Sequence, residues 1–174
     1  KELTITGYYK SDENNNSAYP NLGLARASAI KNYFVQRGMP SRHISTRGQQ
    51  MNEIIADDNS ILYGPDVFSV DLLSSSEILK EEMEAIADEI KGKPLLLYFE
   101  TGAATLTLTP EQRIKVEKIA RYLDKVEEST CYIEGHTDNT GTPEGNMILG
   151  QERADFAKDY LIRNHIRKSK ITAL

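Results

Sequence analysis

The sequence is poor in the residues that build metal, cofactor and catalytic sites. It has no tryptophan, a single cysteine, Cys131, and three scattered histidines that do not match the spacing of a metal site. The cysteine alternates with Ile133 along a predicted strand, which favours a buried side chain over a reactive thiol. Glycine-rich phosphate loops and nucleophile elbows are also missing from the sequence. We therefore expect no metal, no cofactor and no catalytic residue.

Charge and hydropathy exclude two further classes of protein. The 174 residues carry a formal net charge of −5, whereas a protein that binds nucleic acid regardless of its sequence needs a basic face. No apolar run reaches the ~20 residues of a membrane-spanning helix. We therefore expect no nucleic-acid partner and no membrane span in this segment, and we recognise no signal peptide in it. The composition, 39% hydrophobic and 27% charged, suits one globular domain or two small ones.

A strand, a turn and a helix are predicted between residues 131 and 164. The strand runs from Cys131 to Gly135, and the turn has the composition Asp-Asn-Thr-Gly at residues 138–141. The helix is indicated by residues at helical spacing, namely Leu149, Arg153, Ala157, Tyr160 and Leu161. Asp138 then lies at the end of the strand and Arg153 in the first turns of the helix. The two form either an exposed ion pair, worth ~0–1 kcal/mol, or the two charged groups of a ligand site.

The motif GHTDNTG, followed by Asn146, Leu149 and Arg153-Ala154, resembles the OmpA-like peptidoglycan-binding domain family. That family has the motif G-H-T-D, an asparagine eight residues after the aspartate, and L-S-x-x-R-A with the arginine fifteen residues after it. Here Asn146 and Arg153 lie eight and fifteen residues after Asp138. One position departs from the family, because Gly150 replaces the serine. We expect this change to weaken the start of the helix and to leave the two charged positions in place.

The resemblance implies a ligand, meso-diaminopimelate in the stem peptide of Gram-negative peptidoglycan. This amino acid offers an ammonium group, which Asp138 would accept, and a carboxylate, which the planar fork of Arg153 would bind. Asn146 would either orient the ligand or cap the helix, whose N-terminal N–H groups would also favour the carboxylate. His136 is expected to pack at the end of the strand. The ligand-binding residues predicted from the resemblance are Asp138, Arg153, Asn146, Thr137, Asn139, Thr101 and Gly102.

The function implied by the resemblance is binding without catalysis. Asp138 has neither a second carboxylate at acid–base spacing nor a nucleophile beside it in the sequence. The resemblance implies non-covalent anchoring of an outer-membrane or envelope component to the cell wall, on the periplasmic side of the outer membrane. The alternative is a structural interaction module of the envelope in which the ligand site is vestigial.

The first part of the chain repeats the same predicted order of strand, loop, helix and strand. Residues of the first helix match those of the second at a constant offset of 127, as Arg26 matches Arg153. The first strand, however, ends in GYYK, so Lys10 takes the position of Asp138. Two cations would repel an ammonium group, and Asp12 or Glu13 from the longer loop could turn toward the arginine. We therefore expect a degenerate copy.

We predict an α/β fold, an α+β two-layer sandwich built from tandem OmpA-like βαβαβ units. The first unit, residues 1–73, is partial and degenerate and closes with a strand at 66–73, and residues 74–92 form a connecting helix. The second unit, residues 93–174, is the peptidoglycan-binding unit and begins with a buried strand at 94–99. Both units are expected to be truncated, the first at its start and the second before its last strand. A homodimer through the unpaired strand edges is a further expectation.

Overall fold

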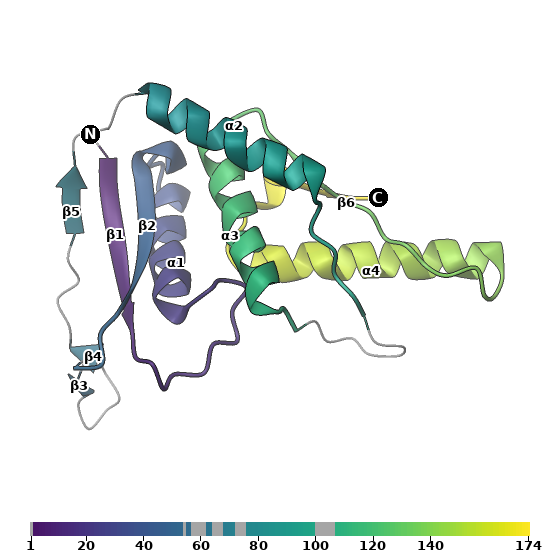
Figure 1. Cartoon of the computed structure of the whole chain (residues 1–174), viewed down its shortest axis with the longest axis horizontal. Helices are drawn as coiled ribbons and strands as arrows, with labels where there is room; N and C mark the ends of the chain where they lie inside the picture. Colours follow the sequence, from purple (N-terminus) through teal and green to yellow (C-terminus); the bar gives the residue numbers. More distant parts are fainter. Residues whose placement is uncertain (1, 54, 57–61, 64–67, 72–75, 100–106) are drawn as a thin grey trace.

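The computed structural model describes all residues except 1, 54, 57–61, 64–67, 72–75 and 100–106. The described residues form a mixed α/β protein with four α-helices and three small sheets (Figure 1), in agreement with the predicted class. The helices are α1 (Leu22–Gln36), α2 (Ser76–Gly92), α3 (Pro110–Lys125) and α4 (Pro143–Arg163). A short hairpin of β3 (Ile55–Ala56) and β4 (Leu62–Tyr63) lies in a region for which no regular structure was predicted.

The first unit contains a three-stranded sheet in the order β2-β1-β5. The central strand β1 (Glu2–Tyr9) pairs in parallel with β2 (Ile44–Gln50) and antiparallel with β5 (Phe68–Asp71). Helix α1 connects β1 to β2 and packs on this sheet (Figure 1). It begins where the side chain of Asn21 accepts a hydrogen bond from the N–H of Leu24. A small core forms between helix and sheet from the buried residues Ile5, Ala27 and Ile44.

The second unit contains a two-stranded parallel sheet, β6 (Cys131–Ile133) and β7 (Ile171–Ala173), connected through α4. Helix α3 precedes β6 and begins at a capping box, in which Thr109 and Gln112 each accept a hydrogen bond from the other's main-chain N–H. Buried residues of α3, α4 and β7 form the larger core of the molecule, and Cys131 packs half-buried against it. Burial raises the pKa of the Cys131 thiol, as expected for an unreactive cysteine.

The two parallel β–α–β arrangements agree in detail. The strand pairs share one register, because Leu3 faces Ile44 in the first unit and Cys131 faces Ile171 in the second. A short 3₁₀ turn precedes the second strand of each pair, at Ser41–His43 and at Lys168–Lys170. Each arrangement also brings a glycine against a glycine in the helix, Gly7 within β1 in the first unit and Gly135 just after β6 in the second.

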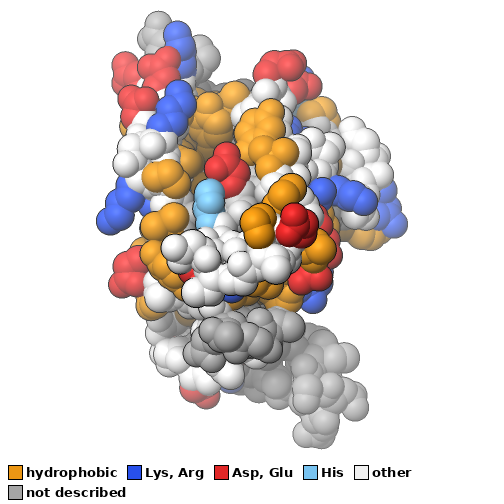
Figure 2. Space-filling view, turned by 90° about the vertical axis from the view of Figure 1, so that its right-hand side faces the viewer, with side chains coloured by type: hydrophobic (Ala, Val, Ile, Leu, Met, Phe, Trp, Pro, Cys, Tyr) orange, Lys and Arg blue, Asp and Glu red, His pale blue; other side chains and the backbone are white. Residues whose placement is uncertain are grey.

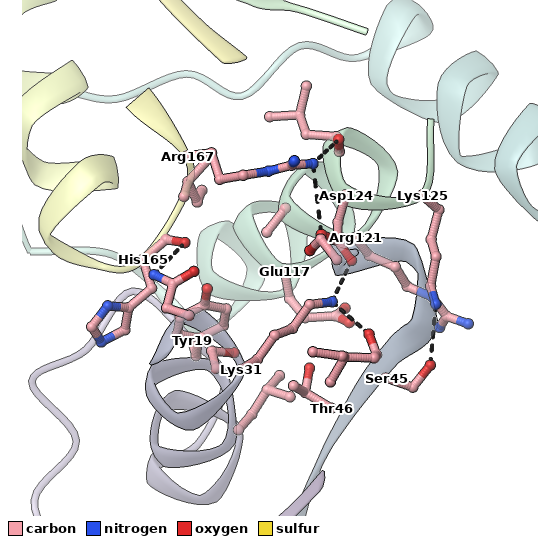
Figure 3. A pocket seen from close by; sticks show the side chains of 18 of the residues that line it. Tyr19, Lys31, Ser45, Thr46, Glu117, Arg121, Asp124, Lys125, His165 and Arg167 are labelled. Carbon is pink, nitrogen blue, oxygen red and sulfur yellow. Dashed lines mark hydrogen bonds and ion pairs between the residues drawn. The ribbon is translucent and has the colours of Figure 1, made fainter. Parts of the chain in front are cut away.

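Helix α3 and the segment after α4 join the two units. The side chain of Lys31 on α1 and the hydroxyl of Ser41 both donate to the carboxylate of Asp124 on α3, and Arg167 lies 3.8 Å from the same carboxylate. These residues line a cavity of about 270 Å³ in which Lys31 and Arg167 reach Asp124 from opposite sides (Figure 3). Burial lowers the pKa of Lys31, and the nearby Asp124 opposes that shift.

Several predicted elements need correction. Residues 94–99 form no strand. Leu95 and Leu97 pack against the core while Leu96 and Tyr98 are 61% and 78% exposed, which is the alternation of a strand. The carbonyl of Leu96 accepts a hydrogen bond from the side chain of Gln112 at 2.7 Å instead of joining a ladder. The strand at residue 131 ends at Ile133 instead of Gly135. Helix α2 packs on α3, and the predicted start of this helix at residue 74 lies outside the described residues.

Candidate functional site

Asp138 lies in the loop that leads from β6 to α4, and its carboxylate is exposed. Its Oδ1 atom accepts hydrogen bonds from the main-chain N–H of Thr140, at 3.0 Å, and from the Thr140 hydroxyl. The hydroxyl and then the N–H hold the pKa of Asp138 below its usual value, with a smaller contribution from the charge of Arg153. Asp138 is therefore a carboxylate at neutral pH. Both hydrogen bonds use Oδ1, so Oδ2 has no donor among the described residues.

The helix that carries the arginine begins earlier than predicted. Thr142 caps α4 by accepting a hydrogen bond from the N–H of Gly145 at 3.1 Å, and Pro143 takes the first helical position. Asn146 therefore does not cap the helix, and its N–H donates to the carbonyl of Thr142 at 2.9 Å. The side chain of Asn146 donates instead to the carbonyl of Asp138 at 3.2 Å. This contact positions the Asp138 loop, which is neither of the two roles predicted for Asn146.

Arg153 lies in the third turn of α4 instead of its first turns, and its guanidinium reaches back to the loop. The Nη1 atom donates to the carbonyl oxygen of His136 at 2.9 Å. The helix can approach the strand end this closely because Gly135 and Gly150 meet without side chains. A Cβ atom on Gly135 would lie 1.8 Å from the Gly150 carbonyl oxygen. The expectation that Gly150 weakens the helix start is thus wrong, since this glycine is buried inside α4 at the contact that sets the site.

Asp138 and Arg153 bond to different partners within the loop. Asp138 hydrogen-bonds to Thr140 and Arg153 to His136, and the structure records no ion pair between these two described side chains. The described residues therefore do not show the exposed ion pair between Asp138 and Arg153 that was one of the two predicted alternatives. A carboxylate and a guanidinium stand at one loop, each with hydrogen-bonding capacity not used within the described part of the protein.

The remaining predicted residues have different surroundings. Thr137 is half-buried and Asn139 is exposed, both in the same loop as Asp138, whereas Thr101 and Gly102 lie outside the described residues. His136 does not pack at the strand end as predicted, because its side chain is 82% exposed and its ring lies 3.8 Å from the carboxylate of Glu134, which is also exposed. Its main-chain carbonyl is instead the group that positions Arg153. That role has no signature in the sequence, because any residue supplies a carbonyl.

The first unit holds its arginine in the same way. Arg26 donates through Nη1 to the carbonyl of Tyr8 at 2.7 Å, the contact that matches Arg153 and His136. The carboxylate of Glu13 then binds the guanidinium, with distances of 2.5 Å to Nη2 and 3.1 Å to Nη1, and accepts a third hydrogen bond from the N–H of Lys10 at 2.8 Å. The hydrogen bond from Arg26 is the main reason that the pKa of Glu13 lies below its usual value. Of the two acids that could turn toward the arginine, the structure selects Glu13.

The end of the molecule where α4 begins carries apolar side chains mixed with charged ones (Figure 2). Exposed large apolar residues of the second unit are Leu96, Tyr98, Ile114, Tyr132, Met147, Ile148, Leu149 and Leu174. The cavity at Asp124 lies between the units and is lined by neither Asp138 nor Arg153. Within the described ranges, no cluster of three or more His, Cys, Asp or Glu side chains could hold a metal ion, and no helix is long and apolar enough to cross a membrane.

Comparison with known proteins finds a family match in the second part of the chain. Residues 98–174 match the model of the OmpA family, which confirms the resemblance seen in the motif. Three similar curated proteins are each named peptidoglycan-associated lipoprotein. That of Haemophilus influenzae is 42% identical over 52 residues, which cover 30% of this chain and 34% of that protein. That of Pasteurella multocida is 36% identical over 55 residues, or 32% and 37% of the two chains. That of Mesorhizobium japonicum is 26% identical over 78 residues, or 45% of each chain.

These comparisons have a limited span. The match covers between 34% and 45% of the length of these three relatives, so the chain spans less than half of each. Their shared name refers to association with peptidoglycan and names no reaction.

Proposed function

We propose that the second unit binds peptidoglycan through the diaminopimelate of the stem peptide and so anchors an envelope component to the cell wall. The OmpA-family match and the names of the relatives support the association with peptidoglycan. On this proposal the protein works on the periplasmic side of the outer membrane. Asp138 and Arg153 bind the zwitterionic end of the ligand, and no bond is broken.

We further propose that the two units are tandem copies of one OmpA-like unit, of which the first is degenerate. The common strand register, the 3₁₀ turn before the second strand and the paired glycines support this relationship. So does the contact from each arginine to the carbonyl of the residue after the glycine, Tyr8 after Gly7 and His136 after Gly135. The shared framework allows the first unit to serve as a guide to the second.

The observation that carries the ligand proposal is the contact between Arg26 and Glu13. A carboxylate binds the guanidinium of the first unit through both Nη atoms, at 2.5 and 3.1 Å. Arg153 is oriented by the matching carbonyl contact, and no described carboxylate covers its guanidinium. A ligand carboxylate would therefore bind Arg153 as Glu13 binds Arg26, with a charge-assisted fork that lysine could not provide.

The second charge of the site explains why the ligand would be zwitterionic. Asp138 stands where the first unit has Lys10, so only the second unit offers an acceptor for an ammonium group beside the arginine. Diaminopimelate carries an ammonium and a carboxylate on one carbon at the end of its side chain. A lysine side chain at the same place in the stem peptide would offer the ammonium and leave Arg153 without a partner.

The test is a calorimetric titration of the full chain with a diaminopimelate-containing muropeptide. Asp138→Ala and Arg153→Ala each remove a charged hydrogen-bonding partner worth ~1.5–3 kcal/mol, so we expect each to weaken binding roughly 10- to 100-fold. Arg26→Ala is the matched control and should leave the affinity unchanged. A lysine-containing muropeptide should bind the unaltered protein as weakly as Arg153→Ala binds the diaminopimelate form. Unchanged affinity in either Asp138→Ala or Arg153→Ala would refute the assigned site.

The second candidate function is structural, as an interaction module that associates through its strand edges. The observation that favours it is that β6 pairs only with β7 among the described strands, whereas β1 has partners on both sides. Tyr132 at the centre of β6 is 64% exposed. A homodimer that uses this edge should appear as a concentration-dependent doubling of mass in light scattering and should be abolished by Tyr132→Pro. A strictly monomeric protein that binds the muropeptide would exclude this candidate.

A further inference from the structure

We propose that the first unit contains a second carboxylate-binding site and that Glu13 of the same chain occupies it as a tethered ligand. The proposal goes beyond the peptidoglycan site of the second unit and rests on the contacts around Arg26. The ligand class is a carboxylate without an ammonium group beside it. Glu13 keeps such ligands out, so the site is available only when its carboxylate is removed or displaced.

The site is complete without any contribution from Glu13. Three N–H donors converge on the two carboxylate oxygens, because Nη1 of Arg26 and the N–H of Lys10 both bond Oε2 while Nη2 of Arg26 bonds Oε1. The guanidinium is oriented by the Tyr8 carbonyl at 2.7 Å, an acceptor that belongs to β1. Arg26 itself extends from the middle of α1. Removal of the Glu13 carboxylate therefore leaves an oriented fork and a main-chain N–H directed at one position.

The loop that carries Glu13 is held at both ends by other residues. Near its start, the N–H of Ser11 donates to the side chain of Asn52 at 3.0 Å. Toward its end, the side chain of Asn15 donates to the Tyr19 carbonyl at 2.8 Å, and the N–H of Ala18 donates to the side chain of Asn164 at 2.8 Å. The Glu13 side chain between these anchors is 24% exposed. A small solute can thus reach the same position from solvent without dismantling the loop.

The charges at the site define which carboxylates it accepts. Lys10, at the position of Asp138, is close enough for its charge to contribute to the lowered pKa of Glu13. With Arg26 it makes the position doubly positive. A ligand with an ammonium group beside its carboxylate would bring a third cation to it. The two units therefore suit different ligands. The second unit suits a zwitterionic group, and the first unit suits a simple anion such as the carboxylate of an N-acylated peptide.

The experiment titrates the full-length Glu13→Ala chain with acetate and follows amide chemical shifts by NMR, with chloride keeping the ionic strength constant. We expect the amides of Lys10 and Arg26 to shift and to saturate in the millimolar range, as befits so small a ligand. The unaltered protein should show no saturating shift at these amides, because Glu13 fills the site. The double variant Glu13→Ala/Arg26→Ala should show none either, because the fork is absent. Glycine, which carries an ammonium group, should shift Glu13→Ala less than acetate does at the same concentration.

Two outcomes would overturn the proposal. One is a folded Glu13→Ala variant whose Lys10 and Arg26 amides do not respond to acetate. The other is an equal response in the unaltered protein or in the double variant, which would mean non-specific binding. If Glu13→Ala does not fold, Glu13→Ser, which also leaves the position of the carboxylate empty, is titrated instead and judged by the same criteria. The signals of the first unit are separate from those of Asp138 and Arg153, so failure here leaves the muropeptide titration to be judged by itself.

Discussion

The geometry of the contact between Gly135 and Gly150 predicts how much an alanine at either position would lower the stability of the protein. A Cβ atom on Gly135 would lie 1.8 Å from the Gly150 carbonyl oxygen, which is 1.6 Å short of the 3.4 Å at which ordinary contact begins. Because the obstacle is main chain, β6 or α4 would have to move as a whole. A Cβ atom on Gly150 would lie 3.0 Å from the Gly135 carbonyl oxygen, only 0.4 Å short of ordinary contact. Two substitutions at one contact should therefore have very different effects.

We expect Gly135→Ala to lower the free energy of unfolding by about 3 kcal/mol or more, as severe overpacking does. Gly150→Ala should change it by less than about 1 kcal/mol, because alanine gains ~1 kcal/mol of helix propensity that offsets the tight contact. Urea unfolding followed by circular dichroism measures both values. Gly135→Ala should also impair muropeptide binding, since the next residue, His136, holds Arg153. A Gly135→Ala protein with native spectrum and a loss under about 1 kcal/mol would refute the described approach of strand and helix.

Two further predictions concern charged groups at the junction of the units. Asp124→Ala should lower stability by ~3–5 kcal/mol in thermal unfolding, because it leaves Lys31, whose side chain is 13% exposed, without its carboxylate. Adding Lys31→Met should recover part of that lost stability. An unchanged melting temperature in Asp124→Ala alone would contradict the described contact between Lys31 and Asp124. Burial raises the pKa of Glu117, so its ionised form is less favourable in the folded state and stability falls as pH rises through that pKa. Glu117→Gln should therefore raise the melting temperature at pH 7, and the gain should vanish at acidic pH where the carboxyl is protonated in both states.

Local patterns in the sequence predicted the helices well. The helical spacing of the apolar residues between 22 and 37 indicates a helix there, and α1 spans Leu22–Gln36. The run Thr109-Pro110-Glu111-Gln112 indicates a capped helix start from neighbouring residues alone, because a capping box needs only side chains three positions apart. The prediction of a strand at residues 94–99 was wrong because a strand depends on residues far away in the sequence. An apolar run reports burial, whereas a strand also needs a partner, and the partner is set by distant parts of the chain.

The site was predictable in its side chains and not in its main-chain contacts. The spacing of Asp138 and Arg153 placed both at one strand–loop–helix reversal, where the structure also has them. The contacts that hold them, from Arg153 to the His136 carbonyl and from Asn146 to the Asp138 carbonyl, involve groups that every residue carries. One signal could have revealed the geometry earlier. Glycines recur at matched positions in both units, Gly7 with Gly23 and Gly135 with Gly150, as a close approach of strand and helix requires.

The loop that carries Glu13 also has a consequence for how the protein folds. Ala18, at the end of that loop, is fully buried in the core of the second unit, and the neighbouring Ser17 carbonyl accepts a hydrogen bond from Arg113 on α3. The second unit thus takes part of its core from a residue that lies 90 to 153 positions upstream of the other members. Neither unit can lose its structure without exposing apolar surface of the other. We expect a single cooperative unfolding transition for the pair, so that a pull on one unit is resisted by both.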